Sequence, residues 1–533
     1  MRFPMSPPRT AALLAACTLV AASAAAVPQQ MELGTIDFPT SGAPAAQEDF
    51  IRGVLLLHSF EYEPAAAAFR AAQAEDTDFA MAYWGEAMTY NHPLWAQQDR
   101  DAAVAALERL GPTPEARAAK AGTEKEKAFV AAVEALYTGP GDKYARDFAY
   151  NDAMRRMYDA WPDDNEVATF YALSLLGTSH DGRDFSIYMR AAAIAEQVFE
   201  RNPDHPGAAH YLIHSFDDPI HAPLGLPAAR AYSGIAPGAS HAQHMTSHIF
   251  VAMGMWDDVV AANEVARDVQ DTQRAERGLG PNGCGHYNSW LQYGYLQQGR
   301  IDAAETEMNL CQEFMAASDG AASGYYANMR ARFVIDSQRW GGVDHWTAEV
   351  RGAGPMANYV FTTGLAALKQ GDMERARRAA GRLQRTTAGD GTLVFARILQ
   401  LELDALLALA DGNRDDALAM LTEATVTEEN MPFEFGPPAV VKPSHELLGE
   451  VLLELEDYDA AVAAFEDALA RSPRRTQSLL GLANAAAGAG DMQRADEARA
   501  ELMEIWKDSD EGFTDERSPS RWPGPWPHAQ PPW

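Results

Sequence analysis

Two histidine pairs with the same internal spacing carry the strongest chemical signal in the sequence. His210 and His214 stand four residues apart, and the pair recurs 34 residues later as His244 and His248. Residues at i and i+4 lie on one face of an α-helix with roughly 5 to 6 Å between their Cβ atoms, so each pair can ligate one metal ion. Two further histidines flank the second pair. The sequence therefore predicts one metal site built from six imidazoles: His210, His214, His241, His244, His248 and His286.

The identity of the ion stays open, because imidazole nitrogens suit Cu, Zn and Fe alike. Cys284 would favour Cu(I) or Zn if its thiolate joined the site. Asp217 or Asp218 would favour Fe or Zn, or would orient a ligating histidine by accepting its hydrogen bond. Any single helical histidine is more often structural than ligating. The clustering of eight of the 14 histidines between His205 and His286 favours a shared site, with His205 and His221 interpreted as loop residues at its rim.

A weaker signal comes from an aromatic and sulfur-rich stretch near the N-terminus. Trp84 and Met88 are predicted to line the same groove as the histidines, where Met88 could offer copper a soft ligand. Ordinary packing in the core is the default interpretation of both residues.

Small and aromatic residues at fixed offsets indicate helical hairpins. Gly449, Ala461, Phe465, Ala468 and Pro473 stand where the two helices of a repeat would touch closely, and the aromatic ring would fill the gap between neighbouring hairpins. The N-terminal set repeats this pattern as Gly53, Ala65, Phe69 and Ala72. With the 34-residue histidine offset, these positions predict stacked pairs of antiparallel helices.

On these residues the chain resembles the tetratricopeptide repeat (TPR) superfamily over most of residues 46–505. The resemblance implies an all-α solenoid, or superhelix, of helical hairpins whose concave groove binds a protein or peptide; it does not imply catalysis. More narrowly, "HPGAAHYLIHSFDDP" followed by "HAQHMTSHIF" resembles a histidine-rich block in exported bacterial TPR proteins that have no established activity.

Four insertions interrupt the repeat, and in repeat proteins such insertions become loops on one face, frequently the binding face. They lie near residues 139–141 and at 178–185, 276–285 and 431–438. The predicted organisation is a signal peptide (1–26), a linker (27–45), N-terminal repeats (46–160), central histidine-rich repeats (161–315), C-terminal repeats (316–505) and a Pro/Trp-rich tail (506–533).

The N-terminus predicts export. Arg2 and Arg9, an apolar run and Ala24–Ala26 have the order of a secretory signal peptide, which predicts a periplasmic or secreted protein. The box ending at Cys17 offers the alternative of a lipid-anchored envelope protein. No other segment is apolar enough to predict a transmembrane helix. The formal charge of −32 argues against nucleic-acid binding. Only Cys284 and Cys311 remain after export, too few for a disulfide scaffold; the two could pair, although their spacing does not demand it.

Three functions follow from these patterns. The first is an exported TPR binding or assembly module with a His-ligated transition metal in its groove. The second is a metalloenzyme, a hydrolase or oxidoreductase, in which the catalytic residues are unknown and only Asp217, Asp218 and Tyr211 could transfer protons. The third is a metal-free protein-interaction scaffold of the cell envelope. The first is favoured because no acid or base is clearly paired with the histidines.

Overall fold

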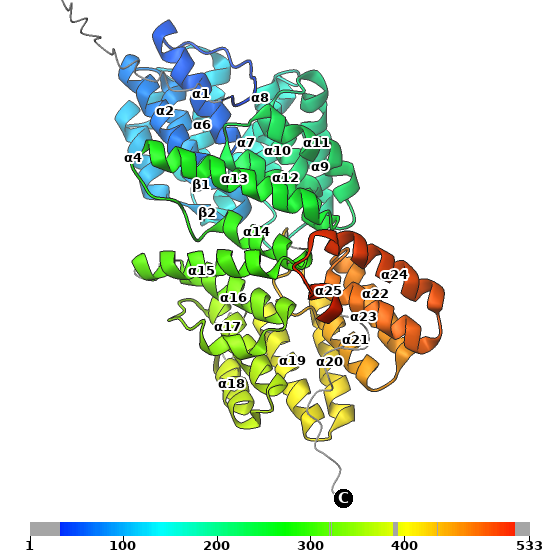
Figure 1. Ribbon diagram of the computed structural model, residues 1–533. Helices are drawn as coiled ribbons and strands as arrows, with labels where there is room; N and C mark the ends of the chain where they lie inside the picture. The colour runs from blue at the N-terminus through cyan, green and yellow to red at the C-terminus, as the bar shows by residue number, and fades with distance from the viewer. Residues whose placement is uncertain (1–31, 319, 321, 387–392, 434, 517–533) are drawn as a thin grey trace, which may run out of the picture. The chain divides into compact units, whose positions relative to one another are not determined.

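In the computed structural model, the described residues (32–318, 320, 322–386, 393–433 and 435–516) form an all-α fold with one two-residue strand pair (Figure 1). The helices as far as α13 are α1 Gln47–His58, α2 Tyr62–Glu75, α3 Ala80–Met88, α4 Arg100–Leu110, α5 Pro114–Ala118, α6 Glu124–Tyr137, α7 Lys143–Ala160, α8 Asn165–Leu176, α9 Phe185–Arg201, α10 Pro206–Phe216, α11 Ala222–Ile235, α12 Ser240–Ala252 and α13 Trp256–Glu276. Strands β1 Asn91–His92 and β2 Gln97–Gln98 pair antiparallel around the 3₁₀ turn Pro93–Trp95.

The remaining helices continue the same pattern of paired helices. They are α14 His286–Gln297, α15 Ile301–Ala317, α16 Ser323–Ser337, α17 Ala353–Lys369, α18 Met373–Thr386, α19 Val394–Ala410, α20 Arg414–Glu429, α21 Ser444–Glu454, α22 Tyr458–Arg471, α23 Thr476–Ala489, α24 Met492–Ile505 and α25 Phe513–Glu516. Consecutive helices pack as hairpins, for example α10 with α11, α12 with α13 and α23 with α24. The first helices of adjacent hairpins are also in contact, for example α10 with α12. The predicted all-α helical-hairpin solenoid is confirmed.

The hairpins pack through the small and aromatic residues that the sequence singled out. A Cβ atom on Gly449 or Gly481 would lie 2.9 or 2.2 Å from the ring of Phe465, and one on Gly53 or Gly85 would lie 2.7 or 2.3 Å from Phe69. These separations are shorter than van der Waals contact, so only glycine lets the helices approach a shared ring this closely. One buried aromatic ring thus joins three helices in each hairpin stack.

Contacts between distant hairpins depart from a linear solenoid, in which each repeat touches only its neighbours. Arg475, just before α23, pairs with Asp336 of α16 at 2.6 Å and with Glu446 of α21 at 2.8 Å, and all three side chains are buried. Near this point the indole of Trp256, on α13, donates a hydrogen bond to the carbonyl of Arg474 at 3.0 Å. These buried contacts hold the C-terminal hairpins against helices α13 and α16 in the middle of the chain.

The predicted signal peptide, the alternative lipid anchor at Cys17 and the tail tryptophans (Trp522, Trp526, Trp533) lie outside the described residues. Of the helices that the structure describes, none combines the length and apolar character needed to cross a bilayer.

Candidate metal centre

The 34-residue offset places the two histidine pairs on helices that touch each other. His210 and His214 lie on α10, while His241, His244 and His248 lie on the adjacent α12. His286 is the first residue of α14, and its ring lies 4.5 Å from that of His244. The structure thus brings all six predicted histidines into one neighbourhood.

The start of α10 explains how this helix is held in place. The His205 ring accepts a hydrogen bond from the Ala208 backbone N–H at 3.2 Å, and Pro206 occupies the first helical position, where its missing N–H costs nothing. A Cβ on Gly207 would lie 2.4 Å from Nδ1 of His58, at the end of α1. Glycine therefore allows α10 to pack directly against α1.

Polar residues on α12 satisfy their own hydrogen bonds. The hydroxyls of Thr246 and Ser247 donate to the carbonyls of Gln243 and His244, and the Gln243 amide donates to the carbonyl of Ser233. These side chains can therefore be buried without taking up the hydrogen-bonding nitrogens of the imidazoles.

The first triad consists of His210, His214 and His241. One ring nitrogen from each lies within 4.8 Å of those of the other two. Nδ1 of His210 donates to the carbonyl of His58 at 2.6 Å, and Nδ1 of His214 donates to a carboxylate oxygen of Asp217 at 3.3 Å. The Nε2 atoms of all three are buried and have no hydrogen-bond partner among the described residues. Because Nδ1 of His210 and of His214 carries the hydrogen, Nε2 of each of these two rings holds a lone pair that meets no donor among the described residues.

The second triad consists of His244, His248 and His286, and it too has ring nitrogens within 4.8 Å of one another. The Nε2 atoms of His244 and His248 face each other at 3.2 Å. Nδ1 of His244 lies 2.7 Å from Oδ1 of Asn263, and Nδ1 of His248 lies 3.0 Å from Oδ2 of Asp217.

Asp217 joins the two triads. Its Oδ2 accepts hydrogen bonds from both His214 and His248, while its other oxygen pairs with Arg183. Burial alone would raise the pKa of Asp217, but the charge of Arg183 and the two imidazole hydrogen bonds outweigh it and hold the pKa below its usual value. An ionised Asp217 is the kind of outer partner that orients metal-ligating histidines.

Asp218, the other predicted carboxylate, forms no hydrogen bond or ion pair with either triad in the described part of the chain. It is buried, pairs with Arg183 and accepts hydrogen bonds from the backbone and ring of His221. Its contacts fix the turn between α10 and α11. His221 therefore lies beside the centre, bonded to Asp218, rather than facing the triads.

Five of the six histidines are buried and His286 is half-buried, so they do not line an open groove as the sequence predicted. The exposed fraction of the side chain is 0% for His210, 8% for His241 and 0% for His244. Aromatic rings cover the cluster: Phe60 and Trp95 contact the first triad, Trp290 contacts the second, and Phe435 stacks on His248 with 5.4 Å between ring centroids.

Burial also determines the protonation of the imidazoles. Loss of solvation lowers the pKa of His214 to about 4 and of His286 to about 3, and it lowers those of His210, His241 and His244 well below their usual value. These five side chains are therefore neutral at pH 7, which is the form that binds a metal ion.

Two of the predicted insertion loops reach the cluster. Arg183, which holds Asp217, comes from the insertion at 178–185, and Phe435 comes from the insertion at 431–438. The second loop also borders a pocket on the Asp217 side, whose polar lining includes Glu428 and Arg471. Arg183 was not among the predicted site residues, although its place in an insertion next to the histidine block was a usable signal.

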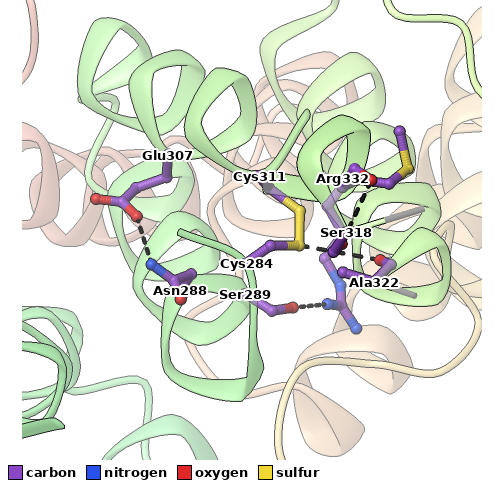
Figure 2. Close-up of a disulfide and its surroundings, with 9 residues drawn as sticks. Cys284, Asn288, Ser289, Glu307, Cys311, Ser318, Ala322 and Arg332 are labelled. Atoms are coloured by element: carbon purple, nitrogen blue, oxygen red, sulfur yellow. Dashed lines mark hydrogen bonds between the residues drawn. A yellow bond between two sulfur atoms is a disulfide. The ribbon is translucent and has the colours of Figure 1, made fainter. Parts of the chain in front are cut away.

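Cys284 is bonded to another cysteine, contrary to its predicted role as an extra ligand. It forms a disulfide with Cys311 of α15, in surroundings that include the Asn288–Glu307 and Ser289–Arg332 hydrogen bonds (Figure 2). A disulfide sulfur is not the thiolate that binds metal. The bond instead links the loop that precedes His286 to α15.

The predicted groove residues Trp84 and Met88 also lie elsewhere. Trp84 is fully buried and packs against Phe38, Phe129 and Phe170, with ring centroids 5.1 to 5.9 Å away, so it belongs to the N-terminal core. Met88 is buried in the wall of a separate small pocket. The default interpretation of these two residues, packing rather than ligation, fits their surroundings.

A neighbouring group of buried histidines has no unused nitrogen. Glu166 accepts hydrogen bonds from Nε2 of His58 at 2.8 Å and from Nε2 of His205 at 3.0 Å. The other nitrogens contact the hydroxyl of Tyr211 and the backbone of Ala208. We call His58, Glu166 and His205 the saturated trio, since every ring nitrogen has a partner. His58 and Glu166 were not among the predicted site residues, because both are distant from the histidine block in sequence.

Comparison with known proteins supports the repeat class. Residues 447–509 match the tetratricopeptide repeat family model. Over these residues the chain matches a TPR helical repeat, in agreement with the resemblance seen in the sequence. A search of curated proteins gives no match.

Solved structures that match include the yeast Tom70 (13% identity, 89% of this chain and 98% of that chain, TM-score 0.35). The human IFIT1 dimer with m7Gppp-AAAA also matches (13% identity, 84% and 94%, TM-score 0.38). A third match is the APC/C hetero-tetramer Cut9-Hcn1 (13% identity, 90% and 77%, TM-score 0.33). Similarity this distant carries nothing about function.

Proposed function

We propose that this protein is an exported TPR scaffold that holds a transition-metal ion in the first triad. The observation that carries the proposal is that three buried Nε2 atoms, on His210, His214 and His241, lack any hydrogen-bond partner among the described residues. A buried polar atom without a partner costs about 1–3 kcal/mol, so three of them side by side need an explanation. A bound cation would satisfy all three.

The chemistry of the donors supports a borderline transition metal such as zinc or copper. Two of the three imidazoles have Nδ1 engaged by a fixed acceptor, which leaves Nε2 as the ligand atom. Ligand nitrogens on one tetrahedral ion lie about 3.3 Å apart, so an ion would draw the three rings inward. The carboxylate of Asp217 would then complete a carboxylate–histidine–metal arrangement.

The surroundings favour holding the ion over turning over a substrate. The first triad lies beneath Phe60 and Trp95, and its side chains are at most 8% exposed. An ion in this place would stabilise the α1, α10 and α12 junction while the repeat surfaces remain available to a protein partner. The Cys284–Cys311 disulfide supports the export part of the proposal, because such bonds persist in oxidising compartments.

Metal content of the full mature chain, purified without an affinity His tag, tests the proposal. The wild-type protein should contain Zn or Cu as isolated or after reconstitution, and the variant His210→Gln/His214→Gln should lose the ion of the first triad. The matched control is His345→Gln, an exposed histidine outside the cluster, which should retain wild-type content. Zinc at 100 times its Kd should also raise the free energy of unfolding by about 2.7 kcal/mol. A wild-type chain that binds no metal under any condition overturns the proposal.

A further inference from the structure

The second triad contains an electrostatic conflict that the first triad does not. The Asn263 amide nitrogen donates to the carbonyl of Val259 at 2.8 Å, which fixes the orientation of the amide. Its oxygen therefore faces Nδ1 of His244, and that nitrogen must carry the hydrogen. On His248 the partner of Nδ1 is the carboxylate of Asp217, which can only accept. In the neutral rings, both Nε2 atoms then hold lone pairs, and these face each other across 3.2 Å.

A cation between the two rings resolves the conflict. The separation of 3.2 Å is close to the roughly 3.3 Å expected for two imidazole nitrogens on one tetrahedral ion with bonds of about 2.0–2.1 Å. His286 adds a third ring nitrogen within 4.8 Å of those of His244 and His248. A single proton would satisfy the facing pair but would leave His286 without a role.

We propose that the second triad binds a second transition-metal ion, and that Asp217 couples the two ions into one two-ion centre. This inference rests on the proposed function, since it extends the ion of the first triad to a pair. Each ion would have three imidazole ligands, from His210, His214 and His241 in one case and from His244, His248 and His286 in the other.

The coupling follows from a shared hydrogen-bond acceptor. Oδ2 of Asp217 accepts from one histidine of each triad, His214 and His248, whose rings lie 5.4 Å apart. An ion bound to His214 makes that ring a stronger hydrogen-bond donor and draws Asp217 toward it. The hydrogen bond from His248 to Asp217 is weakened as a result. The positive charges of the two ions also repel each other in a buried site. The second ion should therefore bind less tightly than the first, by at least about tenfold.

The test is a calorimetric titration of Zn(II) into the metal-stripped full chain. The wild-type protein should bind two equivalents in two resolved steps. His286→Gln should bind one equivalent, because this position is partly exposed at the start of α14 and its loss removes one ligand of the second triad only. His210→Gln should also bind one, and the control His345→Gln should bind two. Circular dichroism establishes that each variant folds, and His244→Gln replaces His286→Gln if the latter does not.

The outcomes separate this inference from the proposed function. If the wild-type chain binds one equivalent of zinc and His286→Gln binds the same amount, the two-ion centre is overturned. That result would mean that a proton, and not a metal ion, lies between His244 and His248. No bound zinc at all overturns the proposed function itself. Two equivalents with identical affinities in the wild-type chain would overturn the coupling through Asp217.

Discussion

The saturated trio and the first triad are two buried groups of imidazoles in direct contact, yet their hydrogen bonding is opposite. The carbonyl of His58, in the trio, even accepts the hydrogen bond of His210, in the triad. In the trio, Glu166 and its neighbours satisfy every ring nitrogen. In the triad, three Nε2 atoms have no partner among the described residues. Burial and residue type are therefore the same in the two groups, and the proposed ligand role of the triad rests on its ring nitrogens that have no hydrogen-bond partner.

The largest effect is expected from breaking the trio. In Glu166→Gln, the amide would point an N–H at one of two imidazole N–H groups, and the buried charge would be lost. We expect the free energy of unfolding to fall by about 3 kcal/mol, because one buried imidazole N–H loses its acceptor and the other hydrogen bond is no longer charge-assisted, with zinc stoichiometry unchanged in the protein that remains folded. Urea denaturation measures the first quantity.

Glu196→Gln, an exposed change on the neighbouring α9, is the matched control and should be nearly neutral. A loss below about 1 kcal/mol in Glu166→Gln would mean that the trio is not the structural group we describe.

Acid should protonate the buried histidines and the carboxylate of Glu166 in different pH ranges, and each step should cost stability. Burial lowers the pKa of His214 from 6.5 to about 4, so on acidification this imidazole is protonated in the unfolded chain before it is protonated in the folded one. The stability that the neutral ring contributes above pH 6.5 is therefore lost as the pH falls toward 4. For Glu166, burial raises the pKa, but the charges and hydrogen bonds of His205 and His58 lower it to about 2 from 4.5. Its contribution is present above pH 4.5 and is lost as the pH falls toward 2. Each step is worth about 3 kcal/mol.

Unfolding free energies of the metal-free chain at pH 7, 5 and 3 check this order. His214→Gln should reduce the loss of stability between pH 7 and 5 without abolishing it, because the pKa values of the other buried histidines are also lowered, and it should leave the lower step in place. A metal-free wild-type chain whose stability does not change between pH 7 and 5 would contradict the neutral, buried state of the triad histidines.

The fold and the histidine cluster were largely predictable, because both depend on spacing. Helical periodicity and the 34-residue offset put His210 and His214 beside His244 and His248, and the Gly449–Phe465 pattern gave the hairpin contact. The burial of the cluster was not predictable from spacing, because it depends on tertiary structure. Phe60 and Phe435, which are far apart in sequence, both pack against the histidines.

The division of the six histidines into two triads was also beyond the sequence. It results from which Nδ1 atom meets which acceptor, and the acceptors are Asp217, Asn263 and a main-chain carbonyl. Likewise, Cys284 pairs with Cys311 because α15 packs on α14, a contact that the 27-residue separation does not specify. Sequence patterns thus located the cluster, whereas hydrogen-bond partners define its chemistry.

The smallest change gives the most direct contrast between the two groups. In His241→Leu, an apolar side chain of similar size replaces an imidazole that packs against Phe60 and Trp95 and whose Nε2 has no partner among the described residues. The metal-free protein should keep its stability or gain about 1 kcal/mol, because an unsatisfied polar atom is removed, while zinc binding to the first triad is lost.

In His205→Leu, the same substitution removes the helix cap on Ala208 and a hydrogen bond to Glu166, and it should cost about 1–3 kcal/mol. Guanidinium unfolding of both variants without metal measures the difference. Equal losses would mean that the triad nitrogens stabilise the fold as the trio does, and that their lone pairs are not reserved for an ion.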